Sequence, residues 1–300
     1  MLIRNPVAAG RFYPDNAKTL LGEVQYWLTH GAALHSTSQD TINHASLRGV
    51  MLPHAGYVFC GSVIGCTLAQ AWGTRSQTAP VPMHMIFLCP NHTGMGHPLG
   101  IWPEGYWRTP LGDVPVDALL ADALITKQIG FAADTDSHLH EHSIEVLLPF
   151  FQFLSHGAPF YITPVCIGTH TPSVLQTAGQ ALADVMQRYE DIALIVSSDM
   201  NHYEDQQTTL HKDARALAPV LSCDAEGLLD ITQREHITMC GAAPMALALF
   251  AARAAGNPWA KLDTHDTSAA ASGDALHVVG YAGVRFGWNN EADASDHPHK

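Results

Sequence analysis

The stretch MHMIFLCPNHTG, residues 83–94, begins with a continuous hydrophobic run of strand length and ends in a Pro-Asn turn that carries His92. Three other stretches repeat this arrangement of a buried run followed by polar, turn-forming residues. They lead to His54 (LRGVMLPHAGY), to His170 (PFYITPVCIGTH), and to Asp199 and His202 (IALIVSSDMNHY). Strands that are hydrophobic throughout are typical of a sheet that helices cover on both faces.

The segments between these runs have the hydrophobic pattern of helices. The expected helices span residues 61–72, 117–128, 143–154 and 173–189. Alternating strands and helices indicate the α/β class, here a single-domain α/β sandwich whose largely parallel central sheet is flanked by helices. Because ligands bind at the carboxyl ends of parallel strands, we expect the four histidine-bearing strand ends to converge on one crevice.

The remaining segments supply the edges of this domain. We expect a turn at residues 14–16 that starts a first helix, a surface loop at 32–46, and an edge excursion or loop at 106–117. The alternating, valine-rich residues 275–286 predict a late strand. These assignments give one domain over residues 1–286 and a polar, disordered tail over residues 287–300.

The composition excludes several classes of partner. A hydrophobic content of 47% suffices for a large core, and a formal charge of −13 argues against nucleic acid or an anionic membrane as the main partner. No hydrophobic run approaches the roughly 20 residues that cross a bilayer, and the first residues lack the apolar region of a signal peptide. Six scattered cysteines without a C-x-x-C pair favour a cytoplasmic location.

His54 and His92 are candidate metal ligands. Each follows a buried run and is itself followed within two residues by a glycine. Two strand-end histidines and one anionic group would make a facial three-ligand site with open positions, which suits Fe(II); soft ligands would also admit Cu(I) or Zn(II). Either histidine alone could instead cap a helix or accept a hydrogen bond in the core.

Asp199 and His202 stand three residues apart and would share a face if the loop between them turns helically. They could be metal ligands, or an acid–base histidine oriented by a carboxylate. The alternative is a helix-capping aspartate beside a solvated histidine.

The densest cluster of ionisable residues lies in DSHLHEHSIEVLLPF, residues 136–150. If a helix covers residues 143–154, Glu141 and His142 lie at its N-terminus, where the helix dipole favours a carboxylate. We interpret both as groups on the substrate side of the site. His138 and His140 are expected in a solvated loop.

Cys240 precedes a glycine and a helix rich in Ala, Leu and Met. A thiol at a helix N-terminus has a lowered pKa, so it could be a ligand or a nucleophile. Burial as a small hydrophobic residue is the alternative. The chain has no G-x-S-x-G elbow, no phosphate-binding P-loop and no H-E-x-x-H motif.

Seven ordered motifs are similar to those of one known family. They are RNPVAAGRFYP, LPHAGYVFCG, PNHTG, EHSIEVLLPF, SSDMNHY, CGAAP and TSAAASGDALHVVGYAG. Through them the chain resembles, over about residues 5–286, the Memo family, whose prokaryotic members are called AmmeMemoRadiSam system protein B. That family is similar in fold to the class III extradiol dioxygenases of the LigB type, which hold non-haem Fe(II) with two histidines and a glutamate.

The resemblance implies a metal held by His54, His92 and Cys240, with further functional groups around it. Asp199 and His202 are the catalytic groups that the resemblance places near the metal. We add His142 as a further candidate catalytic group, and Glu141, Tyr57 and Asn91 as groups that face the substrate or support the ligands. A thiolate in place of the dioxygenase carboxylate makes the site softer, which favours redox-active iron or Cu(I) and argues against ring cleavage of catechols.

Three functions are compatible with this sequence. The first is a metal-dependent oxidoreductase acting on O₂ and a small substrate, in a system that includes radical-SAM and AMMECR-type proteins, as the resemblance implies. The second is a binding or adaptor protein whose pocket accepts a peptide. The resemblance suggests this function because eukaryotic Memo proteins look like adaptors that accept a phosphotyrosine peptide near the same pocket. The third is iron or copper handling with the same ligands.

Overall fold

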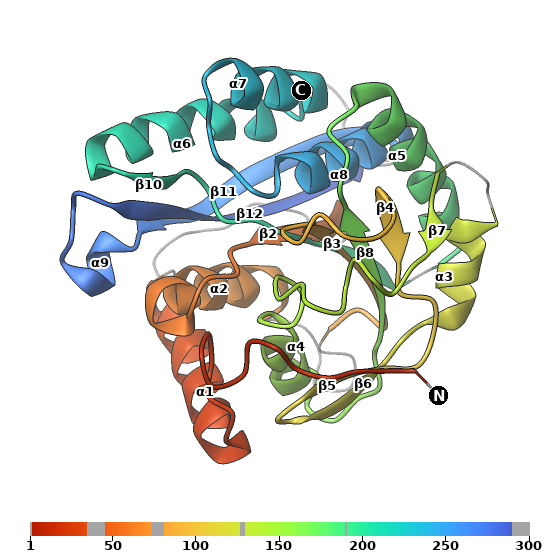
Figure 1. Cartoon of the computed structure of the whole chain (residues 1–300), viewed down its shortest axis with the longest axis horizontal. Coiled ribbons are helices and arrows are strands. Elements are labelled where there is room, and N and C mark those ends of the chain that lie inside the picture. Colours follow the sequence, from red (N-terminus) through yellow and green to blue (C-terminus); the bar gives the residue numbers. More distant parts are fainter. Residues whose placement is uncertain (1, 35–45, 74–80, 127–129, 190, 290–300) are drawn as a thin grey trace, which may run out of the picture.

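The four hydrophobic runs form adjacent parallel strands at the centre of one sheet (Figure 1). The computed structural model describes residues 2–34, 46–73, 81–126, 130–189 and 191–289. In spatial order the central strands are β2 (Leu47–Leu52), β9 (Ile192–Ser197), β3 (His84–Pro90) and β8 (Tyr161–Ile167). Their side chains are buried almost throughout, as expected for strands with helices on both faces.

The flanks of the sheet are antiparallel to its centre. Next to β2 lies β12 (Val278–Asn289), which also pairs with β10 (His202–Glu204) and β11 (Asn257–Thr267). At the other flank, β4 (Leu99–Ile101) runs antiparallel to β8 and pairs with β7 (Ala132–Ala133). The predicted α/β architecture with a largely parallel central sheet is confirmed, with antiparallel additions at both edges.

Helices cover the two faces of this sheet and form two hydrophobic cores (Figure 1). The first face carries α3 (Ala118–Ile125), α5 (Pro172–Met186), α6 (Gln206–Leu221), α7 (Ala225–Arg234) and α8 (Ala242–Ala255); the second carries α1 (Ala17–Leu34), α2 (Tyr57–Trp72) and α4 (Leu148–Leu154). Strand β3 shows the division, because Ile86 and Leu88 face the first core whereas Met85 and Phe87 face the second. None of these described helices is long and apolar enough to cross a membrane.

The helix predicted for residues 143–154 is wrong in its first half, since α4 begins only at Leu148. Residues 143–147 form successive turns instead. Pro149 lies in the first turn of α4. A helix starting at residue 143 would place this proline in its interior, where it removes a hydrogen bond and clashes with the preceding turn. Glu141 and His142 therefore lie on a loop and not at the N-terminus of α4.

Other boundaries also differ from expectation. Helix α2 begins at Tyr57, four residues before the predicted start, and α5 ends at Met186, three before its predicted end. The segment predicted as an edge excursion is a hairpin of β5 (Tyr106–Thr109) and β6 (Gly112–Pro115), which forms a small separate sheet with β1 (Ile3–Arg4). Of the predicted 117–128 helix, residues 127–128 lie outside the described residues.

The two segments predicted to be unstructured are partly ordered. Strand β12 continues to Asn289, so residues 287–289 of the predicted tail belong to the sheet; Trp288 is buried there and pairs with Pro258. Residues 290–300 lie outside the described residues. In the predicted 32–46 loop, residues 32–34 end α1 and residues 35–45 lie outside the described residues.

Candidate metal centre

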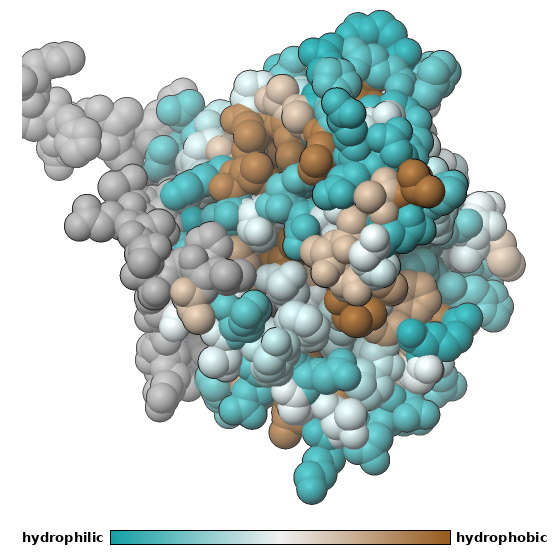
Figure 2. Space-filling view, turned by 90° about the vertical axis from the view of Figure 1, so that its left-hand side faces the viewer, coloured by the Kyte–Doolittle hydropathy of each residue, from teal (hydrophilic) through white to brown (hydrophobic). Residues whose placement is uncertain are grey.

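A pocket of about 640 Å³ lies at the carboxyl ends of β2, β3 and β9. His54, His92, His142 and Asp199 line it, together with residues of α9 (Ala269–Ser272) and the start of β12. Figure 2 looks onto the side of the molecule where α9 lies in Figure 1, and hydrophobic residues gather there in separate patches among hydrophilic ones. The lining of the pocket joins these ionisable groups with the apolar side chains of Phe12 and Phe59.

His54 is held in one orientation and one tautomer. Its Nδ1 lies 2.7 Å from the hydroxyl oxygen of Ser197, and this hydroxyl donates to the carbonyl oxygen of Ser143 at 2.7 Å. The single proton of the Ser197 hydroxyl is donated to Ser143, so Nδ1 of His54 must be the donor in the bond to Ser197. Nε2 of His54 is then unprotonated, and its lone pair faces Sγ of Cys240. Burial, with the nearby His142 and His92, lowers the pKa of His54 well below its usual value, so the ring is neutral.

His92 is held in the same way by a carboxylate. Its Nδ1 lies 3.0 Å from Oε1 of Glu141, and its backbone N–H donates to Oε2 at 2.8 Å. Burial pushes the pKa of Glu141 upward, but the hydrogen bonds and charges of His92 and His142 outweigh it and hold this pKa far below the usual range. The charged Glu141 thus fixes Nδ1 of His92 as a donor, and Nε2 is again unprotonated.

His142 completes a group of three imidazoles. Its ring centroid lies 5.5 Å from that of His54 and 5.2 Å from that of His92. One nitrogen from each ring lies within 4.8 Å of the others, the spacing of a candidate three-histidine metal site. Burial lowers the pKa of His142, which favours the neutral, ligating form. The cluster differs from the expected ligand set, in which Cys240 was the third member.

Cys240 borders the cluster from the other side. Its Sγ lies 3.5 Å from Nε2 of His54 and accepts the backbone N–H of Asp199 at 3.2 Å. The lowered pKa predicted for this thiol is wrong, because burial raises its pKa well above the usual value. Helix α8 begins two residues later, at Ala242, and desolvation outweighs any benefit from its N-terminus. Without a metal, Cys240 is therefore a thiol, and its role as a ligand stays a prediction.

Asp199 is buried and accepts the backbone N–H of His54 at 2.8 Å through Oδ1. Burial raises its pKa, although the hydrogen bond from His54 and the nearby imidazoles act in the opposite direction. The predicted helical turn between Asp199 and His202 is absent, since His202 begins strand β10. Both side chains nevertheless line the same pocket.

His202 is oriented by Thr238 rather than by Asp199. The backbone N–H of His202 donates to Oγ1 of Thr238 at 2.8 Å, and Nδ1 of His202 lies 2.9 Å from the Thr238 carbonyl oxygen. Because a carbonyl oxygen only accepts, Nδ1 carries the proton and Nε2 can accept one. Asn201 secures Thr238 by accepting its N–H and its hydroxyl at 3.2 and 3.1 Å.

Two residues predicted near the substrate lie behind the pocket wall. Tyr57 is buried and its hydroxyl donates to the carbonyl of Val146 at 2.8 Å. Asn91 accepts the N–H and hydroxyl of Thr93 and donates to the carbonyl of Met95, so it shapes the loop that carries His92. Neither belongs to the lining of the pocket as described, and their contact with substrate stays a prediction.

Two other histidines do not behave as expected. His138 is fully buried against Trp102 and Trp107, and burial lowers its pKa to about 4, so the solvated position predicted for it is wrong. His140, in contrast, is exposed, as predicted.

His170 follows β8 but lines a different pocket, beside α7. Only three of the four strand ends therefore meet at the candidate metal centre.

The N-terminal segment is anchored beneath the cluster by Glu145. This buried carboxylate pairs with Arg4 and accepts the hydroxyl of Tyr13 at 2.6 Å and the N–H of Ala8 at 2.8 Å. The anchoring places Phe12 against His142, with ring centroids 4.6 Å apart. The motif RNPVAAGRFYP therefore contributes a wall of the pocket.

Sequence reasoning missed Ser197, Thr238 and Phe12 as parts of the site. Thr238 had a signal: it stands two residues before Cys240, and in an extended segment residues two apart share a face. Ser197 and Phe12 had none that a single sequence offers.

Comparisons with known proteins match the chain over nearly its whole length. A family profile described as Memo-like protein covers residues 4–285. A MEMO1 family protein of Thermotoga neapolitana is 37% identical over 284 residues, which cover 93% of this chain and 98% of that protein. A MEMO1 family protein of Sulfurisphaera tokodaii is 35% identical over 290 residues, which cover 95% of this chain and 100% of that protein. Among solved structures, an uncharacterized protein from Escherichia coli K12 has 14% identity and a TM-score of 0.47, over 80% of this chain and 99% of that chain.

Proposed function

The chain belongs to the Memo-like protein family, and from this premise we propose that it is a metal-dependent oxidoreductase with one redox-active metal ion in its pocket. The observation that carries the proposal is the matched orientation of two imidazoles. Nδ1 of His54 donates to Ser197 and Nδ1 of His92 donates to Glu141, so Nε2 of each ring is the atom that would bind a metal; on His54 this atom faces the Cys240 thiol at 3.5 Å. Metal-binding histidines almost always donate their other ring nitrogen in this way.

The third ligand would be Cys240 or His142. Cys240 is the ligand that the family resemblance implies, and its Sγ lies 3.5 Å from Nε2 of His54. His142 is the residue that already offers a nitrogen within 4.8 Å of the other two. We propose Fe(II) on His54, His92 and the Cys240 thiolate; Cu(I) and Zn(II) also suit these donors. When bound, the metal would supply one-electron chemistry with O₂ or a small substrate.

His202 would act as the acid–base group of this site. Its Nδ1–H is committed to the Thr238 carbonyl, so Nε2 can take a proton from a substrate hydroxyl in the pocket. Asp199 interacts electrostatically with His202 from within the pocket. Its carboxylate would therefore stabilise the imidazolium that proton transfer creates.

The substrate of this reaction would be a small molecule. The pocket volume of about 640 Å³ lies within the range of roughly 300–1,000 Å³ that is usual for small-molecule sites. Radical-SAM and AMMECR-type proteins, which the resemblance links to this family, are proposed to act on the same substrate. A cytoplasmic location is proposed with them, from the scattered free cysteines.

The proposal is tested by anaerobic purification and quantification of iron, copper and zinc in the wild type and in His54→Gln. A matched control is His84→Gln, because His84, like the proposed ligand His92, is bonded to a carboxylate, here Asp117, but lies at the opposite end of β3. We expect close to one redox metal per chain in the wild type and in His84→Gln, and its loss in His54→Gln. Oxygen consumption with candidate substrates is then measured on the loaded protein.

Two outcomes would favour the other functions. If no variant or condition retains metal, the pocket is that of a binding or adaptor protein, and the metal-dependent reaction is rejected. If metal binds tightly but no substrate increases oxygen consumption and the ion is readily passed to a chelator, iron or copper handling becomes the better description.

A further inference from the structure

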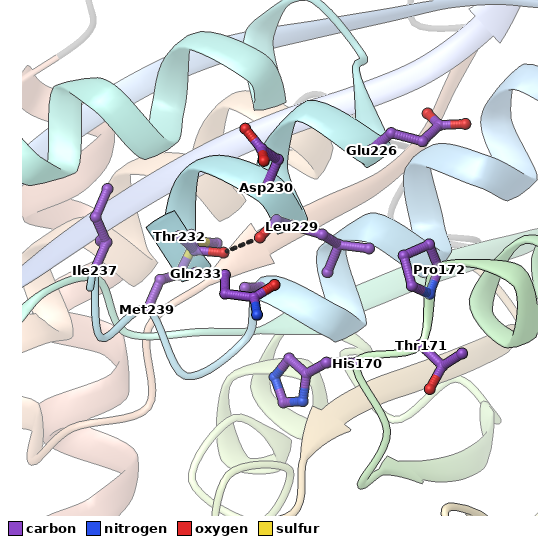
Figure 3. A pocket seen from close by; sticks show the side chains of 11 residues that line it. His170, Thr171, Pro172, Glu226, Leu229, Asp230, Thr232, Gln233, Ile237 and Met239 are labelled. Carbon is purple, nitrogen blue, oxygen red and sulfur yellow. Dashed lines mark hydrogen bonds between the residues drawn. The ribbon is translucent and has the colours of Figure 1, made fainter. Parts of the chain in front are cut away.

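A second pocket, of about 810 Å³, lies among the helices of the first face and shares no lining residue with the candidate metal centre. It is formed by the loop between β8 and α5, by α7, and by the segment that leads into α8 (Figure 3). Leu229, Ile237 and Met239 give it a buried apolar floor. None of its lining residues belongs to the proposed ligands or catalytic groups.

The segment of residues 237–240 separates the two pockets. Ile237 and Met239 line the second pocket, whereas Thr238 holds His202 and Cys240 contacts His54, both of which line the first pocket. This alternation is that of an extended chain, in which successive side chains point to opposite faces. A molecule resting on Met239 therefore touches the back of the segment that places Cys240.

The polar groups of the second pocket fit a neutral ligand. Figure 3 shows the side chains of His170 and Gln233 pointing toward one another across the cavity, while Thr171, the next residue, points to the other side of the loop. Within the described part of the chain, none of these three side chains has a hydrogen-bond partner, so their donors and acceptors are available.

The charged groups at the rim are already paired. Glu226 binds Arg253 at 2.6 Å, and Asp230 pairs with Arg234. Among the residues that the structure describes, neither Lys nor Arg lines the cavity, and two carboxylates stand at its rim, which disfavours an anionic ligand. Since both carboxylates have arginine partners, a cation gains little.

We propose that the second pocket is a binding site for an uncharged amphipathic small molecule and that its occupancy is sensed at Cys240. The apolar body of the ligand packs on Leu229, Ile237 and Met239, and a polar end with both donor and acceptor binds between His170 and Gln233. A pocket of this size and polarity is usual for small-molecule ligands. Because Met239 and Cys240 are adjacent, repacking of Met239 changes the position of the thiol beside His54.

Phenylacetamide is a suitable probe, because it joins an apolar ring to a neutral amide, and phenylacetate is its anionic counterpart. The full-length protein, labelled with ¹³C at the methionine methyls and at the cysteine Cβ atoms, is titrated with each probe. We expect phenylacetamide to shift the Met239 methyl and the Cys240 Cβ resonances with one saturation curve, and phenylacetate to bind more weakly. Met239→Leu assigns the methionine signal.

Two variants and one control locate the binding site. Leu229→Trp fills the pocket and should abolish both shifts, whereas Gln233→Ala should weaken binding about threefold to tenfold, the effect of one hydrogen bond. Gln25→Ala changes an exposed glutamine of α1, on the other face, and should leave the titration unchanged. Thermal unfolding of each variant shows that it is folded.

Several results would overturn the inference. Absence of Met239 shifts up to the solubility limit of phenylacetamide, or shifts that persist in Leu229→Trp, would reject the binding site. Tighter binding of phenylacetate would reject the neutral ligand. Saturable Met239 shifts without any change at Cys240 would reject the coupling. None of these readouts depends on a bound metal or on enzymatic activity.

Discussion

Nδ1 of His54 lies 2.7 Å from the hydroxyl oxygen of Ser197, although the two residues stand 143 positions apart in the sequence. The Ser197 hydroxyl donates onward to the Ser143 carbonyl, on the loop that also carries Glu141 and His142. One serine at the end of β9 therefore sets the tautomer of His54 and ties β2 to that loop.

Replacing Ser197 by alanine should weaken metal binding about tenfold to 100-fold, the usual effect of losing a group that orients a ligand. Without the hydroxyl, Nδ1 of His54 loses its acceptor, and the proton can move to Nε2, where it blocks the metal. Competition titration with a chelator measures the affinity. Thr163→Val is the control, because Thr163 is a buried hydroxyl on β8 that has no partner among the described residues. Equal affinity in Ser197→Ala and Thr163→Val would contradict the role of Ser197.

The Glu141–His92 pair should give the metal-free protein a defined pH dependence. Burial opposes both charges, but the pair outweighs it: the pKa of Glu141 falls below 4.5 and the pKa of His92 rises above 6.5. Glu141 therefore stabilises the fold above about pH 4.5 and loses this effect as pH falls through its native pKa. His92 stabilises the fold below about pH 6.5 and loses its effect as pH rises through its native pKa.

Glu141→Gln should therefore lower the free energy of unfolding most between about pH 4.5 and 6.5. Urea unfolding of both metal-free proteins from pH 3 to 9 measures the difference. Asp113→Asn, which removes the exposed carboxylate beside Arg108, provides a control with little effect at any pH. A difference between wild type and Glu141→Gln that does not vary with pH would show that the pair carries no net charge interaction.

The buried strands could be predicted because their signal is local. The hydrophobic runs before His54, His92, His170 and Asp199 all form central strands. Their alternation with helices along the chain indicated that these strands are parallel. The prediction that all four strand ends meet in one pocket is wrong for His170, because the loop that follows β8 turns toward α7, on the first face of the sheet. Which face a strand-end residue reaches depends on loop geometry, which hydrophobic periodicity does not encode.

The partners of the site residues could not be predicted, because they come from distant segments. Thr238 holds His202 from 36 positions away, and Glu145 anchors residues near the N-terminus. The shift in the pKa of Cys240 was predicted in the wrong direction. Its position before a helix suggested that the helix dipole would lower the pKa, whereas burial of the thiol in the fold raises it. Burial of a particular atom is a property of the assembled structure.

Arg4→Met should destabilise the protein by about 3–5 kcal/mol, because it leaves the carboxylate of Glu145 buried without its cation. Both side chains are almost fully buried, and the guanidinium also lies 4.6 Å from the ring centroid of Trp107. Chemical denaturation measures the loss. Arg234→Ala removes an exposed ion pair with Asp230 and should have almost no effect. A change in Arg4→Met as small as that of Arg234→Ala would show that Glu145 is satisfied by its other hydrogen bonds.

Gly65→Ala should destabilise the protein by about 3 kcal/mol, since α1 and α2 pack too closely to admit another methyl group. A Cβ at Gly65 would lie 2.1 Å from the carbonyl oxygen of Trp27, and the backbone of neither helix can yield. Gly22 lies in α1, the helix that packs against Gly65 of α2, but a Cβ added at Gly22 would meet no atom within 4 Å, so Gly22→Ala should stabilise the protein by about 0.5–1 kcal/mol. Thermal melts of both variants give opposite shifts if this packing is correct.

Proton release on metal binding should identify the third ligand. Burial keeps Cys240 as a thiol in the metal-free protein, whereas His54 and His142 are already neutral because burial lowers their pKa values. Coordination by the Cys240 thiolate must therefore expel one proton that coordination by His142 does not. Anaerobic calorimetry at pH 8, in two buffers of different ionisation enthalpy, counts the protons. We expect wild type and His142→Ala to release one more proton per Fe(II) than Cys240→Ala, whereas equal counts in wild type and Cys240→Ala would make His142 the third ligand.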